Sequence, residues 1–293
     1  MTSLDFDVMP SMGKATMRAF LARKKKVKVD ALPQLSAKVS GVCFDPSLLE
    51  SFHRLCSVPD ATYIPPTALH VMVAPLHMMM LANPAFPMPL LGLVHIDNRI
   101  VQHRAIEPDA VFDITSELGA LGSNEKGARF EIVTRAMSKG EIVWEEVSGI
   151  LKRTTSGKKR GTKRPKPRFG EQAEPARSSL WDIPADAGRR YAALSGDYNP
   201  IHLTAASAKL FGFKRAIVHG MWSLARCVSE MDSELKRLNE GAYALDVSFK
   251  TPVFLPSQVA FHTYDDDKGG VRFALRSSDG VKPHLVGHLS PLT

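Results

Sequence analysis

The sequence of 293 residues is poor in cysteine, and it contains no cluster of cysteine and histidine with the spacing of a metal site. The three cysteines, Cys43, Cys56 and Cys227, are odd in number and far apart. This pattern excludes a disulfide framework or a zinc module and is typical of a reducing compartment. With 44% hydrophobic and 23% charged residues, the composition predicts a cytoplasmic globular protein of one large domain or two smaller ones.

One long stretch lacks charge: no Asp, Glu, Lys or Arg occurs from Ala61 to Ile96. A run of this length could cross a bilayer, but it holds six prolines, each of which removes a backbone donor from a helix. We therefore expect the buried centre of a globular domain, and no membrane partner. The first ten residues carry two acids and no apolar core, so we also expect no secretory signal.

The net charge of +8 is concentrated in two basic stretches, and the rest of the chain is mildly acidic. Residues 14–28 hold seven Lys or Arg, and residues 152–168 hold nine and no acid. We interpret both stretches as solvated tethers. The alternative is attraction to an anion, such as nucleic acid, coenzyme A or an acidic carrier protein. Nucleic acid is the weaker of these alternatives, because no zinc finger, helix-turn-helix or RNA-binding motif is present.

The clearest boundary is residues 152–180, which are rich in Lys, Arg, Gly, Pro and Ser and are predicted to form a flexible linker. It separates an N-terminal unit, 36–151, from a C-terminal unit, 181–293, and residues 1–35 are interpreted as an extension that docks on the outside. Matched prolines and matched histidines of the two units are offset by 148 and 149 residues. Such an offset of about half the chain indicates a duplicated domain.

Each unit is predicted to contain one long apolar helix and about four antiparallel strands. The helices are expected at 67–81, kinked or interrupted near Pro75, and at 220–238. The strands are expected at 91–101, 110–115, 128–136 and 142–151 in the first unit, and at 243–253, 258–264, 270–277 and 283–289 in the second. Lys-Gly and Asp-Gly turns close the last hairpin of each unit. A sheet wrapped on a buried helix predicts the α+β fold class.

The residues that indicate chemistry lie at 191–202, in the sequence YAALSGDYNPIH. The stretch from Gly196 to Pro200 predicts a turn, which places Asp197 in the turn and His202 on the short helix after it. A carboxylate and an imidazole that share one water molecule form an acid/base pair that works near neutral pH. Asp197 and His202 are therefore the predicted catalytic pair.

A second motif, AIVHGM at residues 216–221, leads into the second predicted helix. Gly220 at the start of that helix exposes its backbone N–H, and the helix N-terminus adds partial positive charge. Together they suit an anion, specifically the developing enolate oxygen of a thioester. Each motif alone is common in turns and helix caps, but their combination in this order favours a catalytic site.

Several segments of the sequence resemble a known family. Residues 191–202 resemble the signature of the MaoC-like (R)-specific enoyl-CoA hydratases, and residues 218–221 resemble the start of the central helix of their hot-dog fold. Residues 249–256 are similar to the strand pair that follows, so this resemblance covers about 180–293. The N-terminal unit resembles, less diagnostically, the degenerate first unit of the double hot-dog acyl dehydratases, through residues 64–67 and 90–95.

The resemblance implies a double hot-dog fold, in which two antiparallel sheets each wrap a central helix as a pseudo-dimer within one chain. It implies hydration and dehydration of acyl thioesters with (R) stereochemistry, in fatty acid metabolism. Coenzyme A or an acyl carrier protein would present the substrate, and no metal or other cofactor is expected. The N-terminal unit has no Gly-Asp-x-Asn-Pro-x-His motif, and Asp60 to Pro65 stands in its place. One active site per chain is therefore predicted.

The family's site residues match this sequence as follows. The acid/base pair falls on Asp197 and His202, and the oxyanion donor falls on the N–H of Gly220. The predicted substrate-binding residues are Asn199, Ser195, His219 and Met221, and Asn199 would also hold the loop and orient His202. Which member of the catalytic pair is the acid stays open.

Two other functions remain as alternatives: an acyl-thioester-binding hot-dog protein or accessory subunit without its own chemistry, and a thioesterase. The acyl length, the choice between coenzyme A and a carrier protein, the direction of the reaction and a further homodimerisation also stay open. Five methionines, at positions 72, 78, 79, 80 and 88, are interpreted as core filler or as the lining of an acyl tunnel.

Overall fold

The computed structural model describes residues 2–13, 31–59, 62–90, 92–124, 127–153 and 174–292. Nearly all of the two basic stretches lies outside these residues, so their interpretation as tethers stays a prediction. No helix in the described part of the chain is both long enough and apolar enough to cross a membrane.

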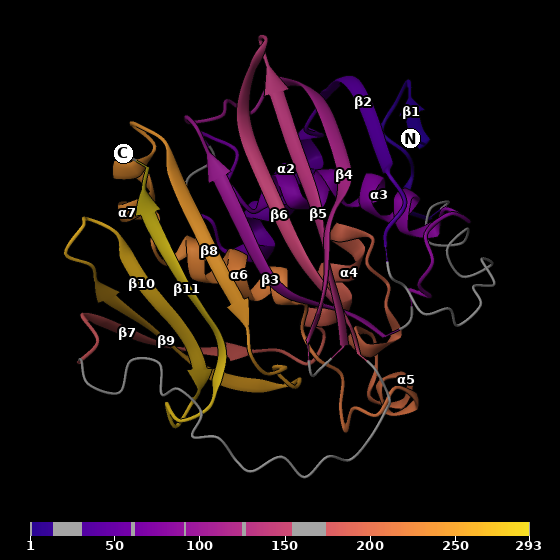
Figure 1. Cartoon of the computed structure of the whole chain (residues 1–293). Helices are drawn as coiled ribbons and strands as arrows, with labels where there is room; N and C mark the ends of the chain where they lie inside the picture. Colours follow the sequence, from indigo (N-terminus) through magenta and orange to yellow (C-terminus); the bar gives the residue numbers. More distant parts are fainter. Residues whose placement is uncertain are drawn as a thin grey trace.

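The described strands form one sheet in the order β1-β2-β4-β5-β6-β3-β8-β11-β10-β9-β7 (Figure 1). The N-terminal unit supplies β1 (Thr2–Phe6), β2 (Leu35–Cys43), β3 (Leu93–Gln102), β4 (Val111–Asn124), β5 (Gly127–Ser138) and β6 (Glu141–Arg153). The C-terminal unit supplies β7 (Arg177–Ile183), β8 (Tyr243–Phe249), β9 (Ser257–Asp265), β10 (Val271–Ser277) and β11 (Pro283–Pro291). Apart from β1, the two units place their strands in the same order, reversed about the middle of the sheet.

The middle of the sheet is the antiparallel pair β3 and β8, which runs from Asp97 opposite Ser248 to Gln102 opposite Tyr243. Backbone hydrogen bonds therefore continue from one unit into the other. This arrangement confirms the predicted α+β class and the internal duplication. The hairpins around Lys139-Gly140 and Asp279-Gly280 are also confirmed.

The first strand of each unit, β2 in the N-terminal unit and β7 in the C-terminal unit, was not predicted from the sequence. Both strands precede the helical segments of their unit and pair with strands far away in the sequence, so no hairpin turn marks them. Strand β7 begins at Arg177, within the stretch assigned to the linker, and pairs with β9. In the N-terminal extension, β1 pairs in parallel with β2, so the first residues dock on the edge of the sheet.

The helices are α2 (Pro46–Cys56), α3 (Ala68–Ala82), α4 (Ala187–Ser195), α5 (Ala205–Leu210), α6 (Gly220–Ser229) and α7 (Asp232–Leu238), with a short 3-10 helix, η1 (Pro200–His202). Helix α3 is continuous through Pro75, so an interruption there is wrong, and the alternative of a kink stays a prediction. The single helix expected at 220–238 is also wrong, because α6 ends before Glu230 and α7 begins at Asp232. Acids in the first turn of α7 favour a new helix start there.

Helices α2, α3 and α6 lie against one face of the sheet (Figure 1). Apolar residues of both units pack into one continuous core beneath them, including Leu69 and Leu76 of α3 and Leu224 of α6, all 0% exposed. Met72, Met80 and Met88 belong to this core, as the core-filler interpretation expects.

Candidate active site

The loop that carries Asp197 begins where helix α4 ends. Gly196 closes α4 with a left-handed backbone, φ +73°, and its N–H donates to Ala192 O at 2.8 Å. Glycine adopts this conformation without steric cost, and a Cβ here would also collide with Met12 of the N-terminal extension. The extension therefore packs on the loop that leads into Asp197.

Side-chain hydrogen bonds fix the loop from Ser195 to His202. The Asp197 N–H donates to Ser195 Oγ at 3.3 Å, and the Asn199 N–H donates to Asp197 Oδ1 at 3.1 Å. Asn199 Oδ1 accepts from the Ile201 N–H at 3.4 Å and so caps η1. Asp and Asn form such side-chain turns readily. The prediction that His202 lies on a helical turn just after the Asp197 loop is confirmed.

His202 is held from two sides. Its Nδ1 lies 2.8 Å from Ile217 O, and because a carbonyl oxygen only accepts, Nδ1 carries the proton. Gly188 of α4 allows η1 to approach, since a Cβ there would overlap the carbonyl oxygen of His202. This tautomer leaves His202 Nε2 with a free lone pair. The His202 N–H also donates to Asn199 O at 2.9 Å, and the predicted role of Asn199 in orienting His202 stays a prediction.

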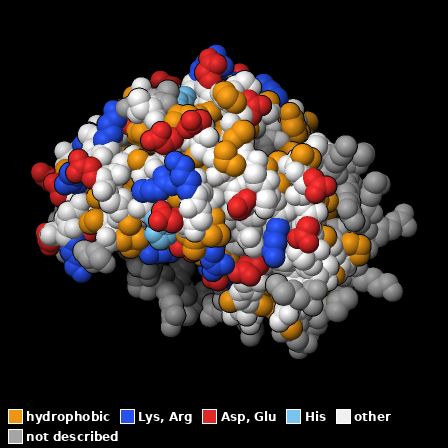
Figure 2. Space-filling view, turned by 90° about the horizontal axis from the view of Figure 1, so that it is seen from above, with side chains coloured by type: hydrophobic (Ala, Val, Ile, Leu, Met, Phe, Trp, Pro, Cys, Tyr) orange, Lys and Arg blue, Asp and Glu red, His pale blue; other side chains and the backbone are white. Residues whose placement is uncertain are grey.

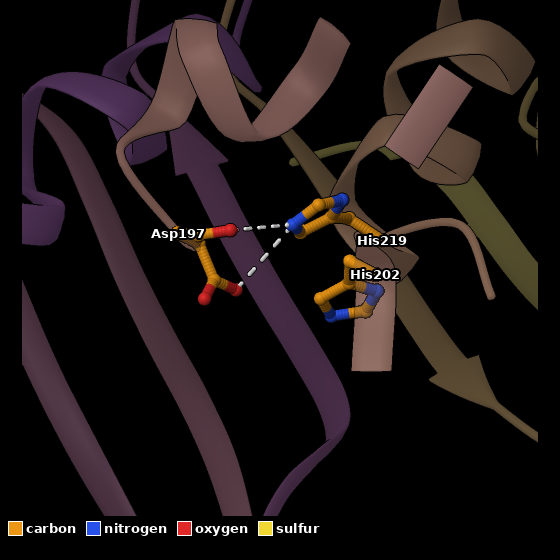
Figure 3. Close-up of side chains that lie close together, drawn as sticks. All are labelled: Asp197, His202 and His219. Carbon is orange, nitrogen blue, oxygen red and sulfur yellow. Dashed lines mark hydrogen bonds and ion pairs between the residues drawn. The ribbon is translucent and has the colours of Figure 1, made fainter. Parts of the chain in front are cut away.

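Asp197, His202 and His219 converge (Figure 3). The rings of His202 and His219 stack with their centroids 3.6 Å apart. His219 Nε2 lies 3.0 Å from Asp197 O and 3.7 Å from Asp197 Oδ2. The Asp197 side chain is 45% exposed, whereas that of His219 is 5% exposed. The carboxylate therefore faces solvent, and the two imidazoles lie beneath it.

Burial sets the charge of both imidazoles. It lowers the pKa of His202, although the Asp197 carboxylate acts in the opposite direction. Burial, reinforced by the neighbouring His202, lowers the pKa of His219 to about 3. Both rings are therefore neutral at pH 7, and His202 Nε2 can accept a proton. His219 donates from Nε2 to Asp197 O, and its buried Nδ1 has no partner among the described residues.

Helix α6 presents the N–H of Gly220 beside this cluster, because His219 is the residue directly before it. The segment that leads into α6 is anchored by the Val218 N–H, which donates to Val253 O at 3.0 Å. Gly220 is partly exposed, and no acceptor for its N–H is found in the described part of the chain. A Cβ on Gly220 would lie 3.0 Å from Phe249 Cε1, so this ring covers the glycine. A free N–H at a helix N-terminus suits a developing oxyanion.

The structure does not bring all predicted substrate-binding side chains to the surface of the site. Ser195 is 7% exposed and its hydroxyl donates to Tyr191 O at 2.8 Å, while Met221 is 5% exposed and lies in the core. Their role in substrate binding stays a prediction. Gly188 and the carbonyl of Ile217 were not predicted from the sequence, because close packing and backbone acceptors leave no side-chain signature.

The cluster could bind either a water molecule or a cation. One possible ligand atom from each of Asp197, His202 and His219 lies within 4.8 Å of the other two. A carboxylate and two imidazoles are a reasonable donor set for a transition metal. The absence of a metal cofactor, expected from the sequence, stays a prediction.

The fold and the site together define a class of protein. Two halves with the same strand order, joined edge to edge with helices on one face, form the double hot-dog fold. In this protein the C-terminal half holds a carboxylate and a neutral imidazole beside a free helix N-terminus. Residues 154–283 match the family model described as MaoC like domain. The chain therefore carries a MaoC-like dehydratase domain.

Relatives and a solved structure agree with this assignment. The protein named 3-hydroxyacyl-thioester dehydratase X of Mycobacterium tuberculosis is 27% identical over 259 residues, which is 88% of this chain and 90% of that protein. The crystal structure of HtdX of Mycobacterium tuberculosis superimposes with a TM-score of 0.75 at 25% identity, covering 88% of this chain and 100% of that one. The (R)-specific enoyl-CoA hydratase of Aeromonas caviae is 38% identical over 69 residues, which is 24% of this chain and 52% of that protein.

Proposed function

We propose that this protein catalyses the (R)-specific hydration of trans-2-enoyl thioesters and the reverse dehydration of 3-hydroxyacyl thioesters. The observation that carries the proposal is the convergence of the Asp197 carboxylate with a neutral His202, next to the free N–H of Gly220. The relatives named dehydratase and hydratase support the same reaction. We place the protein in the cytoplasm, in fatty acid metabolism.

In this reaction, one water molecule lies between Asp197 and His202. Asp197 Oδ2 accepts one hydrogen bond from the water and orients it. As the water oxygen bonds to the β carbon, the second proton passes to His202 Nε2, which the Ile217 carbonyl keeps in the accepting tautomer. The imidazolium then delivers this proton to the α carbon. Water is thus divided into a hydroxyl on the β carbon and a proton on the α carbon, and dehydration reverses each step.

Gly220 stabilises the charge that develops between these two steps. Electron density moves from the double bond to the thioester oxygen as the enolate forms, and the Gly220 N–H donates to that oxygen. The N-terminus of α6 adds partial positive charge there. The neutral His219 ring stacks on His202 without competing for its proton, because its own pKa is about 3.

We further propose one active site per chain, in the C-terminal unit. Asp60 and Ala61, which begin the corresponding N-terminal segment, lie outside the described residues. Tyr63 in that segment donates from its hydroxyl to Asp232 Oδ1 at 3.0 Å, so it ties the segment to α7. The substrate carrier is coenzyme A or an acyl carrier protein, and a further homodimer remains open.

Incubation with trans-2-enoyl-CoAs of short, medium and long chain tests the proposal. Loss of the conjugated thioester absorbance, with an (R)-3-hydroxyacyl product on a chiral column, is the expected result. A folded protein that turns over neither these substrates nor the same enoyl groups on a carrier protein would overturn the proposal in favour of a binding role. Release of free thiol without loss of the double bond would instead indicate a thioesterase.

A chelator tests the expected absence of a metal. Turnover should be unchanged after dialysis against EDTA, because water activation is assigned to Asp197 and His202 alone. Turnover that falls on dialysis and returns with a divalent metal would assign the same cluster to metal binding.

A further inference from the structure

The N-terminal unit contains a polar cluster that the sequence analysis did not predict. It involves side chains from α3, β3, β4, β5 and β6, on the inner side of the sheet. Its members are His70, His77, His95, Asn98, Ser116, Thr134, Glu146 and Ser148. Polar groups are costly to bury, so an apolar core or an acyl tunnel alone gives no reason for such a cluster.

The centre of the cluster is the pair His70 and Glu146. His70 Nδ1 lies 2.7 Å from Glu146 Oε1, and the Glu146 side chain is 0% exposed. Asn98 Nδ2 donates to the same Oε1 at 2.7 Å and to Ser148 Oγ at 3.1 Å. Two donors thus fix the carboxylate, and the carboxylate fixes the orientation of the His70 ring.

The other edge of the His70 ring is available. The side chain is 16% exposed, and no partner for its Nε2 is found among the described residues. Behind the ring, Asn98 Oδ1 and Glu146 Oε2 are buried, likewise without a hydrogen-bond partner in the described part. His70 is therefore held rigidly by Glu146, and the protein leaves the Nε2 edge of its partly exposed ring open to a hydrogen-bonding ligand.

A row of aromatic rings connects His70 with the active site. The Phe249 ring covers Gly220, the His95 ring lies edge-on to Phe249 with centroids 5.2 Å apart, and His95 stacks on His70 at 5.8 Å. All these residues are partly exposed. They form a continuous wall that starts at the oxyanion donor, crosses the seam between β8 and β3, and ends at His70. The Asp197 carboxylate also acts on His70 electrostatically.

The charges around His70 select its ligand. Burial opposes protonation of His70, but the Glu146 carboxylate outweighs it and raises its pKa, with a further contribution from Asp197. Burial lowers the pKa of His77 and that of His95 to about 4, so both are neutral. Glu146 and Asp197 both place negative charge near the ring, which disfavours an anionic ligand. A hydroxyl group is neutral, and it pairs with Nε2 as acceptor or donor in either protonation state.

We propose that His70, held by Glu146, is a substrate-binding residue contributed by the N-terminal unit, and that its Nε2 pairs with a hydroxyl group of the thioester substrate. The inference rests on the proposed function. Two parts of such a substrate can carry the hydroxyl: the acyl chain, or the pantetheine arm of coenzyme A or a carrier protein. In both cases the N-terminal half takes part in recognition while the C-terminal half carries out the chemistry.

The test compares four substrates in the full-length protein. The first two are an alkyl enoyl-CoA and the same enoyl group on N-acetylcysteamine, which has no hydroxyl. The other two are series of these same thioesters in which a hydroxyl is placed at successive positions of the acyl chain. In His70→Leu we expect kcat/KM to fall about tenfold or more, mainly through KM, only for substrates that carry the relevant hydroxyl. A loss confined to chain-hydroxylated substrates assigns the acyl chain; a loss confined to coenzyme A thioesters assigns pantetheine.

The control variant is His103→Leu. His103 Nε2 lies 3.0 Å from Glu145 Oε1 in an exposed pair, so it repeats the chemistry of His70 and Glu146 away from the wall. It should match the wild type on all four substrates. Glu146→Gln, which keeps the shape of the pair, should reproduce part of the His70→Leu selectivity and serves if His70→Leu does not fold.

Equal losses on all four substrates, or no loss on any, would overturn the proposal, because neither depends on a hydroxyl. A wild-type protein inactive on all four and on the same enoyl groups attached to a carrier protein would overturn the proposed function, and this inference with it. The alkyl N-acetylcysteamine thioester separates these results, since its turnover requires the catalytic pair but no hydroxyl contact.

Discussion

The two halves of the sheet share their strand order but use their carboxylates differently. In the C-terminal half, Asp197 lies on a loop with 45% of its side chain exposed, beside two neutral imidazoles. In the N-terminal half, Glu146 lies on a strand, its side chain is 0% exposed, and it is paired with His70. An exposed carboxylate beside neutral imidazole rings can bind a water molecule and take part in transferring its protons. A buried carboxylate paired with a histidine has a fixed charge and suits binding and rigidity.

Catalysis should be the sharpest difference between the halves. We expect Asp197→Asn and His202→Gln each to lower kcat by roughly 10²–10⁴-fold, because each removes one partner of the acid/base pair. Glu146→Gln should lower kcat on an alkyl N-acetylcysteamine thioester far less, since it lies outside the reacting groups. Steady-state hydration rates measure all three. A loss for Glu146→Gln as large as for Asp197→Asn would erase the distinction between the halves.

For stability, the order of the variants should be reversed, with Glu146→Gln more damaging than Asp197→Asn. We expect Glu146→Gln to lower the free energy of unfolding by roughly 3 kcal/mol, the usual scale for breaking a buried pair. Asp197→Asn should change it by about 1 kcal/mol or less, because exposed substitutions are mild. Urea unfolding at neutral pH measures both. Equal destabilisation by the two variants would count against a structural pair in the N-terminal half.

The same pair predicts a pH dependence of stability. The folded pKa of His70 is raised above its ordinary value of 6.5, so its contribution is complete below that pH and is lost as the pH rises through the folded pKa. Burial opposes ionisation of Glu146, but His70 lowers its pKa from 4.5 to about 2, so its contribution is present above pH 4.5 and is lost as the pH falls through about 2. The difference in free energy of unfolding between the wild type and Glu146→Gln should therefore be largest between about pH 4.5 and pH 6.5 and should shrink in alkali.

A smaller effect is expected where Gly220 meets Phe249. Gly220→Ala places a Cβ 3.0 Å from the Phe249 ring, so the ring must move and the oxyanion donor shifts. We expect kcat to fall about tenfold, the scale of partial loss of one oxyanion contact. Phe249→Leu in the same chain should restore part of this loss. An unimproved double variant would show that steric pressure from Phe249 is not the cause.

The smallest effect is expected at the seam between the halves. Arg99 on β3 and Asp246 on β8 form an exposed ion pair across it, with side chains 47% and 42% exposed. Charged side chains of both signs are interspersed on the face shown in Figure 2. Surface pairs contribute about 1 kcal/mol or less, so Arg99→Gln should barely change unfolding by urea. A large loss would mean that the pair, and not the β3–β8 backbone ladder, joins the halves.

Much of the fold could be predicted from the sequence because its hairpins carry strong local signals. The Lys139-Gly140 and Asp279-Gly280 turns, with alternating flanks, fixed both hairpins. The split between α6 and α7 could not be predicted, because the apolar spacing continues through Glu230. Strands β2 and β7 were missed because each is paired by strands far away in sequence, a tertiary effect that local patterns do not contain.

The candidate site was predictable only where its residues are consecutive. Asp197 and His202 fall in one motif, and the structure places them as the turn and short helix required. The polar cluster around His70 in the N-terminal unit was not predictable. His70, His95 and Glu146 come from three separate elements, and neither the pairing of β3 with β6 nor the orientation of α3 is written in their local sequence.

A double-mutant cycle on kcat tests the central claim most directly. If Asp197 and His202 hold one water as a unit, the variant carrying both Asp197→Asn and His202→Gln should be little slower than either single variant. Losses that multiply, so that the double variant is slower by the product of the two single effects, would contradict the shared water and separate the two residues into independent roles.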